Sequence, residues 1–131
     1  MELSDQVCSL ELAKKLKELK FKQTSYFIWF KLKENNDWSL SEAWQIDDNH
    51  RFDEISSFTS SELSELLPSV IYGESASESS YSLNIYRPNN HWHISYTSGH
   101  KTKIVYYAET LADCMAGILI CLITMGIIKN D

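Results

Sequence analysis

The fold is decided by residues 81–108, which read YSLNIYRPNNHWHISYTSGHKTKIVYYA. Two turn signals, Pro88-Asn89-Asn90 and Ser98-Gly99, divide this stretch into three runs rich in aromatic and β-branched residues. The runs are Tyr81–Arg87, His91–Thr97 and Lys103–Ala108. Short strands joined by short turns pair with their sequence neighbours, so this stretch predicts a three-strand antiparallel meander.

The middle run of the meander has one apolar face and one polar face, because side chains alternate across a strand. The first face carries Trp92, Ile94 and Tyr96, and the second carries His91, His93 and Ser95. The apolar face needs a covering layer. The segment after the meander supplies one, since Thr110 and Asp113 form a helix-opening pair and 111–128 is apolar nearly all round.

This last segment has two alternative settings. The apolar run from Cys114 to Ile128 is fifteen residues long, whereas a membrane-spanning helix needs about 20. Its length therefore favours a buried helix, with a tail anchor as the alternative. A helix that is apolar all round must be covered on several sides, and a second copy of the chain is one possible cover, so we also consider a homodimer.

The rest of the chain predicts two helices and two strands. Ser9 is a suitable N-cap for a first helix, and Thr59 with Glu62 forms a capping box for another that ends before Pro68. Residues 25–32 predict a strand buried on both sides and central in its sheet, and 39–46 a weaker strand. Residues 73–80 have linker composition.

These segments predict one α+β domain over residues 1–131. Its antiparallel sheet consists of the 81–108 meander joined by the 25–32 strand, and the N-terminal and C-terminal helices pack on it. Three cysteines, Cys8, Cys114 and Cys121, are an odd number and two lie in the apolar run, which predicts reduced buried thiols. We therefore expect a cytoplasmic protein, and the acidic N-terminus does not resemble a signal peptide.

Charge is sorted along the sequence. Residues 1–33 hold seven basic and four acidic side chains, a net +3, whereas residues 34–78 hold eleven acids and one base, a net −10. This asymmetry predicts a surface with two electrostatic faces, able to attract a charged partner. The acidic stretch also carries aromatic side chains, so we expect it to bind a basic protein groove. The predicted contact residues are Asp47, Asp48, Asp53, Glu54, Trp38 and Trp44. The alternative is that the aromatic residues are core and the acids are only solvated.

The sequence offers little for catalysis, and we predict neither an enzyme nor a cofactor. His91, His93 and His100 are the only weak candidates for a metal site, since no established metal-binding spacing supports them. A winged-helix DNA reader is another alternative, because two helices precede a hairpin. The predicted second helix has no basic residue, however, and the whole chain has a pI near 5.2, which argues against direct nucleic-acid binding.

Three segments resemble small uncharacterised proteins encoded in bacteriophage and prophage genomes. They are 9–19 (SLELAKKLKEL), 58–68 (FTSSELSELLP) and the region from Thr110 to Leu122. In that family a Gly usually follows the first helix, where this chain has Lys20. The resemblance implies a phage-derived accessory protein that acts inside a bacterial cell. For a phage protein, we expect the acidic segment to bind a host or phage protein, for example to inhibit a host nucleic-acid-binding protein such as a defence nuclease or a polymerase. The resemblance brings no catalytic residues.

Overall fold

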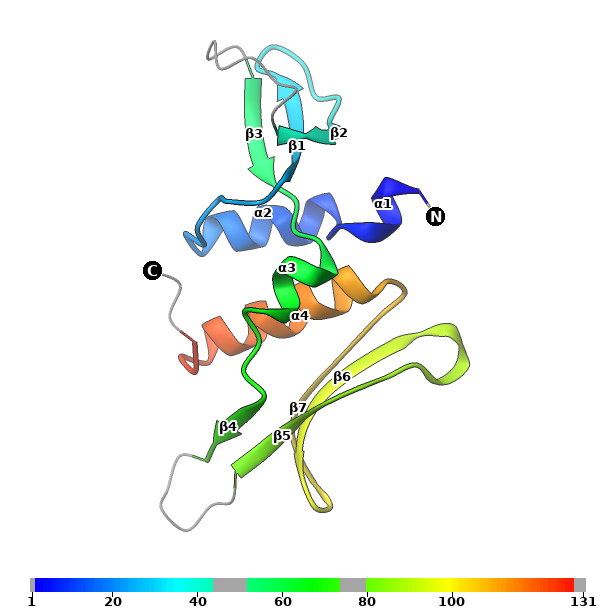
Figure 1. The fold of residues 1–131 in the computed structure, drawn as a ribbon. Helices are drawn as coiled ribbons and strands as arrows, with labels where there is room; N and C mark the ends of the chain where they lie inside the picture. The colour runs from blue at the N-terminus through cyan, green and yellow to red at the C-terminus, as the bar shows by residue number, and fades with distance from the viewer. Residues whose placement is uncertain (1, 44–51, 74–79, 129–131) are drawn as a thin grey trace.

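A computed structural model describes residues 2–43, 52–73 and 80–128. The helices are α1 (Leu3–Gln6), α2 (Leu10–Glu18), α3 (Ser60–Ser64) and α4 (Leu111–Thr124). The strands are β1 (Phe27–Leu32), β2 (Ser39–Glu42), β3 (Phe52–Ser56), β4 (Val70–Tyr72), β5 (Ser80–Tyr86), β6 (Trp92–Ser98) and β7 (Lys101–Ala108). Two antiparallel sheets lie at opposite ends of the molecule, with the helices between them (Figure 1). The predicted α+β class is confirmed.

The meander is confirmed, and it gains a fourth strand. The sheet order is β4-β5-β6-β7, in which β5, β6 and β7 correspond to the three predicted runs. Ile94 and Tyr96 on β6 are fully buried, and α4 packs across this face of the sheet. The apolar face of the middle strand is therefore covered as its alternation predicts.

The strand predicted at 25–32 does not join that sheet, and this part of the prediction is wrong. β1 is instead the centre of a separate sheet with the order β2-β1-β3, in which Trp29 lies opposite both Leu40 and Ile55. Both edges of β1 are thus occupied by strands that follow it closely in sequence. Its central position is confirmed, but only Ile28 is buried on β1, so the expected burial on both sides is not found.

The last helix lies in the middle of the molecule, between the four-stranded sheet and the other helices (Figure 1). Eight of its fourteen residues are buried, among them Ile118, Leu119 and Leu122. The elements of this same chain therefore supply the cover that the sequence left open to a second copy. Dimerisation through this helix stays a prediction, but the need to cover the helix no longer supports it.

Helix α4 ends at Thr124, four residues before the predicted end at Ile128. Gly126 adopts a positive φ of 78°, and the Ile127 N–H donates to the Leu122 carbonyl oxygen at 2.9 Å. This is a Schellman ending, in which glycine reverses the chain and satisfies a terminal carbonyl group. The apolar run continues, but the helix does not.

All three predicted helix starts are confirmed. Ser9, Thr59 and Thr110 each accept a hydrogen bond from the backbone N–H three residues later. The Asp113 carboxylate, expected to complete the cap of α4, accepts instead from the Ser9 N–H, so it joins the starts of α2 and α4. Helix α3 is shorter than predicted. Residues 44–46 of the predicted 39–46 strand and 74–79 of the linker lie outside the described residues.

Candidate functional site

The acidic residues predicted to meet a partner are partly engaged within the chain. Asp53 lies on β3 directly opposite Lys31 of β1, and its Oδ2 is 2.9 Å from the Lys31 Nζ. The hydrogen bond from Lys31 lowers the pKa of Asp53 below its ordinary value. Because Lys31 is only 14% exposed, this ion pair fixes the Asp53 carboxylate against the sheet.

The basic and acidic stretches meet beside the three-stranded sheet. Lys17 of α2 donates from Nζ to the backbone carbonyl oxygen of Glu54 at 2.7 Å, while the Glu54 residue is exposed. Their separation in sequence predicted two separate electrostatic faces. In the structure the two stretches adjoin at this contact instead. The reason is topological, since α2 packs against β3.

Trp38 lies between lysines. Its ring centre is 5.3 Å from the Lys14 Nζ and 5.6 Å from the Lys31 Nζ, and the side chain is half-buried against the core. Ammonium groups over an indole ring are favourable cation–π contacts. The structure thus gives Trp38 packing partners of its own. Trp44, Asp47 and Asp48, the other predicted contact residues, lie outside the described residues.

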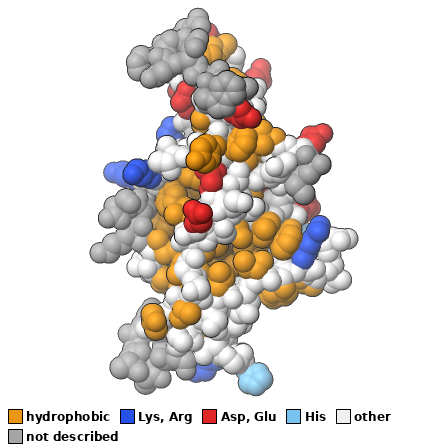
Figure 2. Space-filling view, in the orientation of Figure 1, with side chains coloured by type: hydrophobic (Ala, Val, Ile, Leu, Met, Phe, Trp, Pro, Cys, Tyr) orange, Lys and Arg blue, Asp and Glu red, His pale blue; other side chains and the backbone are white. Residues whose placement is uncertain are grey.

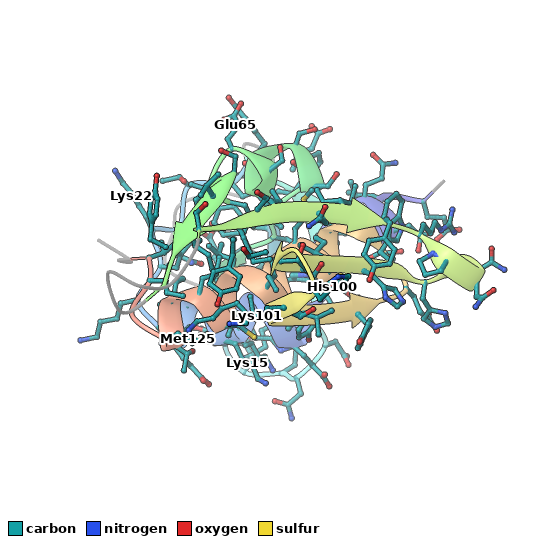
Figure 3. All side chains as sticks on the ribbon, turned by 90° about the horizontal axis from the view of Figure 1, so that it is seen from below. Lys15, Lys22, Glu65, His100, Lys101 and Met125 are labelled. Atoms are coloured by element: carbon teal, nitrogen blue, oxygen red, sulfur yellow. The ribbon has the colours of Figure 1, made fainter. Side chains whose placement is uncertain are left out.

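The three histidines considered for a metal site are not brought together. His91 directly precedes β6 and His93 is its second residue. His100, labelled in Figure 3, lies in the turn that follows the other end of this strand. Within residues 2–43, 52–73 and 80–128, no cluster of three or more His, Cys, Asp or Glu side chains has a geometry suited to a metal ion. His91 Nδ1 lies 3.3 Å from the Asn89 carbonyl oxygen.

His93 belongs instead to an aromatic row on the open face of the four-stranded sheet. Its ring centre is 5.1 Å from that of Tyr86 and 4.3 Å from that of Tyr107, because these three residues are paired across β5, β6 and β7. Tyr86 is 47% exposed and Tyr107 is 57% exposed. We call Tyr86, His93 and Tyr107 the aromatic row. Sequence reasoning placed His93 on this face but missed both tyrosines.

The four-stranded sheet carries most of the exposed apolar surface among the described residues. Five of the eight exposed large hydrophobic side chains lie on its strands: Val70, Tyr72, Ile85, Tyr86 and Tyr107. A shallow cavity of about 380 Å³ adjoins the aromatic row and is lined by His91, His93, Tyr107, Pro88 and Asn89. The five exposed side chains lie on both faces of the sheet, because Ile85 is opposite Ile94 on the face that α4 packs against, whereas the aromatic row and its cavity lie on the open face.

A larger cavity of about 680 Å³ lies where α1, α3 and α4 approach the turn between β5 and β6. At its wall the Arg87 guanidinium lies over the Trp92 ring, 5.4 Å from the ring centre. Asp5 and Glu109 add negative charge to the lining. Most of the rest combines apolar side chains with hydroxyl groups, and these residues are Leu111, Ala112, Thr59, Ser60, Ser61 and Thr110. This lining combines a cation–π pair, two carboxylates, hydroxyl groups and apolar surface.

The cysteines are free, as predicted, and two are buried. Burial raises the pKa of the Cys8 and Cys114 thiols to about 11 in each case. Thiolate is the nucleophilic form, so both groups are poor nucleophiles at neutral pH. Their role is packing, and the Cys114 thiol also donates to the Tyr106 carbonyl oxygen at 3.2 Å.

Among the described helices, none has the length and apolar character to cross a membrane. Comparison of the chain with protein-family models, with curated proteins and with solved structures gives no match.

Proposed function

We propose that this protein is a non-enzymatic protein–protein interaction module that binds its partner through the open face of the four-stranded sheet. The observation that supports this is the aromatic row, in which two half-exposed tyrosines flank His93. Exposed apolar patches with polar rims mark interaction sites on soluble proteins.

The chemistry of the row suits protein recognition. Tyrosine has few rotatable bonds and offers both an apolar ring and a hydroxyl group, and it is enriched among the residues that dominate binding energy. The row is built on three paired strands, so its backbone is held before a partner arrives. Cross-strand ring contacts also hold the side chains, which lowers the entropy lost on binding.

The test is affinity capture from a bacterial lysate with matched variants. A partner bound by the parent chain is expected to be lost with Tyr86→Ser/Tyr107→Ser, because the variant removes both exposed rings of the row. The control is Tyr26→Ser, since Tyr26 is 77% exposed but precedes β1 at the other end of the molecule. A partner retained by the double variant and lost with the control would contradict the proposed surface.

The proposed setting is a phage-derived or prophage-derived accessory protein in the cytoplasm of a bacterial host. One form of this proposal is inhibition of a host nucleic-acid-binding or defence protein through acidic side chains. In Figure 2 acidic groups are spread over the upper half of the visible face, and Glu34, Asp37 and Glu54 are exposed. This form has its own test, because binding driven by charge weakens as salt rises.

The charge test uses Glu34→Gln/Asp37→Asn/Glu54→Gln. Capture through an acidic surface is expected to fall with these changes and with high salt, while the tyrosine variant leaves it unchanged. Asp53→Asn is a matched control for a carboxylate already paired with Lys31. Binding that resists salt and is lost only with the tyrosine variant would contradict inhibition through acidic side chains. It would support binding through the open face of the four-stranded sheet.

The alternative functions have less support from the geometry. A DNA-reading helix should present basic side chains to phosphates, but α3 has five residues and contains no lysine or arginine. A metal-dependent enzyme based on His91, His93 and His100 would require these side chains to converge, and they lie at opposite ends of β6.

A further inference from the structure

Strand β7 forms an edge of the four-stranded sheet. It is the last strand in the order β4-β5-β6-β7, and at eight residues it is the longest strand described. Within the described part of the chain, β6 is its only strand partner. One row of its backbone N–H and C=O groups is therefore available to pair with another strand.

Only the first part of this edge is protected against pairing. Lys101 and Lys103 lie near its start, and a register shift opposite Tyr96 and Thr97 interrupts the ladder there. Charged side chains and bulges are the usual means by which proteins block an edge strand. The remaining segment, Ile104–Ala108, carries no charge and no such irregularity. This half of β7 is thus free to extend the sheet.

We propose that β7 pairs antiparallel with β7 of a second copy of the chain, across a two-fold axis, to form one continuous eight-stranded sheet. The charges favour this partner. Lys101 and Lys103 lie at one end of β7, and Glu109 directly follows the other end. An antiparallel two-fold pairing brings Glu109 of each copy beside Lys101 and Lys103 of the other, because the ends of the strand are exchanged.

Among the described residues, these charged groups have no ion-pair partner of opposite charge. Lys101, Lys103 and Glu109 form no ion pair there, and Lys101 and Glu109 are exposed. Lys103 lies over the Tyr81 ring, 5.9 Å from its centre, which is a weak contact at a partly exposed site. A foreign strand of uniform charge would satisfy one end of β7 and repel the other, whereas a second copy satisfies both.

The dimer is distinct from the surface proposed for the protein partner. Strand pairing at the edge leaves the open face of both sheets accessible and places the two aromatic rows side by side. Tyr107, which is 57% exposed, lies on β7 itself and gains a neighbour from the other copy. A chain that proves monomeric would therefore not contradict binding of a protein partner through the open face. Loss of that partner binding would likewise not contradict the dimer.

The experiment is sedimentation velocity of the full chain over a range of concentrations, with charge-reversal variants. Glu109→Lys places like charges at both ends of the interface, and so does Lys101→Glu/Lys103→Glu. Each variant alone is expected to weaken dimerisation roughly tenfold or more, since like charges across paired strands are repulsive. An equimolar mixture of the two variants restores opposite charges at both ends, so it is expected to form a heterodimer about as tightly as the parent forms a homodimer.

The mixture makes the result independent of any loss of folding, because an unfolded variant could not restore association. Circular dichroism of each variant provides a separate check. A parent chain that stays monomeric up to about 1 mM overturns the proposal, since edge pairing weaker than this has no use in a cell. Dimers that persist unchanged in both variants, or a mixture that fails to associate, also overturn it.

Discussion

Lys20 adopts a backbone conformation that favours glycine. It follows the C-terminus of α2 with a positive φ of 63°, and the neighbouring Phe21 N–H donates to the Leu16 carbonyl oxygen at 2.9 Å. A side chain in this left-handed region is strained. Lys20→Gly is expected to raise the free energy of unfolding by about 1 kcal/mol, because it relieves this strain.

The matched control lies at the end of α4, where Gly126 already occupies the same kind of position with φ 78°. Gly126→Ala is expected to lower stability by about 1 kcal/mol, the reverse of the change at residue 20. Urea denaturation of both variants measures this. Destabilisation by Lys20→Gly would contradict a strained ending for α2.

Gly117 marks a close approach between α4 and the sheet. A Cβ atom added there would overlap the ring of Tyr106 on β7. Gly117→Ala is therefore expected to destabilise the fold by about 1–3 kcal/mol, although alanine is the better helix former. In a Tyr106→Leu background the same change is expected to become neutral or favourable, and a double-mutant cycle in urea measures the coupling. Equal effects in both backgrounds would exclude this contact as the cause.

Asp113 is a partly buried carboxylate with one specific role. Desolvation raises its pKa above the ordinary value, while its hydrogen bond from the Ser9 N–H acts in the opposite direction. The native state therefore holds the proton more tightly than the unfolded chain, and the contribution of Asp113 to stability falls as pH rises from the unfolded pKa through the raised native pKa.

Asp113→Asn keeps an oxygen acceptor for Ser9 and removes the buried charge, so it is expected to match or exceed parent stability at pH 7. Asp113→Ala also removes the acceptor and is expected to cost about 1 kcal/mol or more. Thermal unfolding at several pH values checks both, because the two variants lack the part of the decline that deprotonation of Asp113 causes. A stable alanine variant would show that the link between α2 and α4 is dispensable.

At the scale of elements, the start of α3 connects two parts of the fold. The Thr59 side chain accepts from the Glu62 N–H, and Glu62 Oε1 accepts in turn from the Thr59 N–H and the Ser25 hydroxyl group. Glu62 Oε2 also accepts from the Tyr26 N–H just before β1. The capping box of a five-residue helix thus holds the beginning of the three-stranded sheet.

This double role predicts unequal effects of two cap variants. Thr59→Ala removes one cap and is expected to cost about 1 kcal/mol. Glu62→Ala removes the partner of Thr59 and the two acceptors near β1, so we expect a loss of about 2–3 kcal/mol. Chemical denaturation compares them directly. Equal losses would mean that the contacts with Ser25 and Tyr26 add nothing.

At the scale of the whole molecule, stability is expected to be uneven between the two sheets. Ile28, Ile55 and Ser56 are the only buried residues of β1, β2 and β3, whereas eight residues of α4 are buried. Regions with little burial open locally at a lower free energy than the core. Amide hydrogen exchange is therefore expected to be fastest in β2 and slowest in β6 and α4.

Two variants test whether the sheets open separately. Ile28→Ala is expected to accelerate exchange in β1–β3 and leave α4 unchanged, while Ile94→Ala is expected to accelerate exchange throughout, because Ile94 lies in the central core. Uniform acceleration by Ile28→Ala would show that the molecule opens as one cooperative unit.

The parts of the fold that the sequence predicts are those determined by near neighbours. The caps at Ser9, Thr59 and Thr110 depend on residues three positions away, and the turn at 88–90 determines the pairing of β5 with β6. The sheet to which β1 belongs depends on distant pairings instead, and hydrophobic alternation carries no information about them. β4 is too short, at three residues, to give a periodic signal.

The same distinction applies to the surface residues. Tyr86 and His93 face each other across the turn. Pairing the two strands residue by residue from this turn would therefore have predicted their contact. Lys31 pairs with Asp53 across β1 and β3, two strands that lie far apart in the sequence. The number of acidic and basic residues in each stretch does not predict such a pair. Charge sorted in sequence is therefore a poor guide to charge sorted in space.

The central position of α4 has a consequence for biosynthesis. This helix follows every strand that the structure describes, yet α1, α2, α3, β6 and β7 all pack against it. During translation β6 leaves the ribosome before α4 does, so Ile94 and Tyr96 stay uncovered until α4 has emerged as well. A chaperone that binds nascent apolar segments would protect the chain during this interval. Depletion of such a chaperone is thus expected to lower the yield of folded protein without altering a single residue.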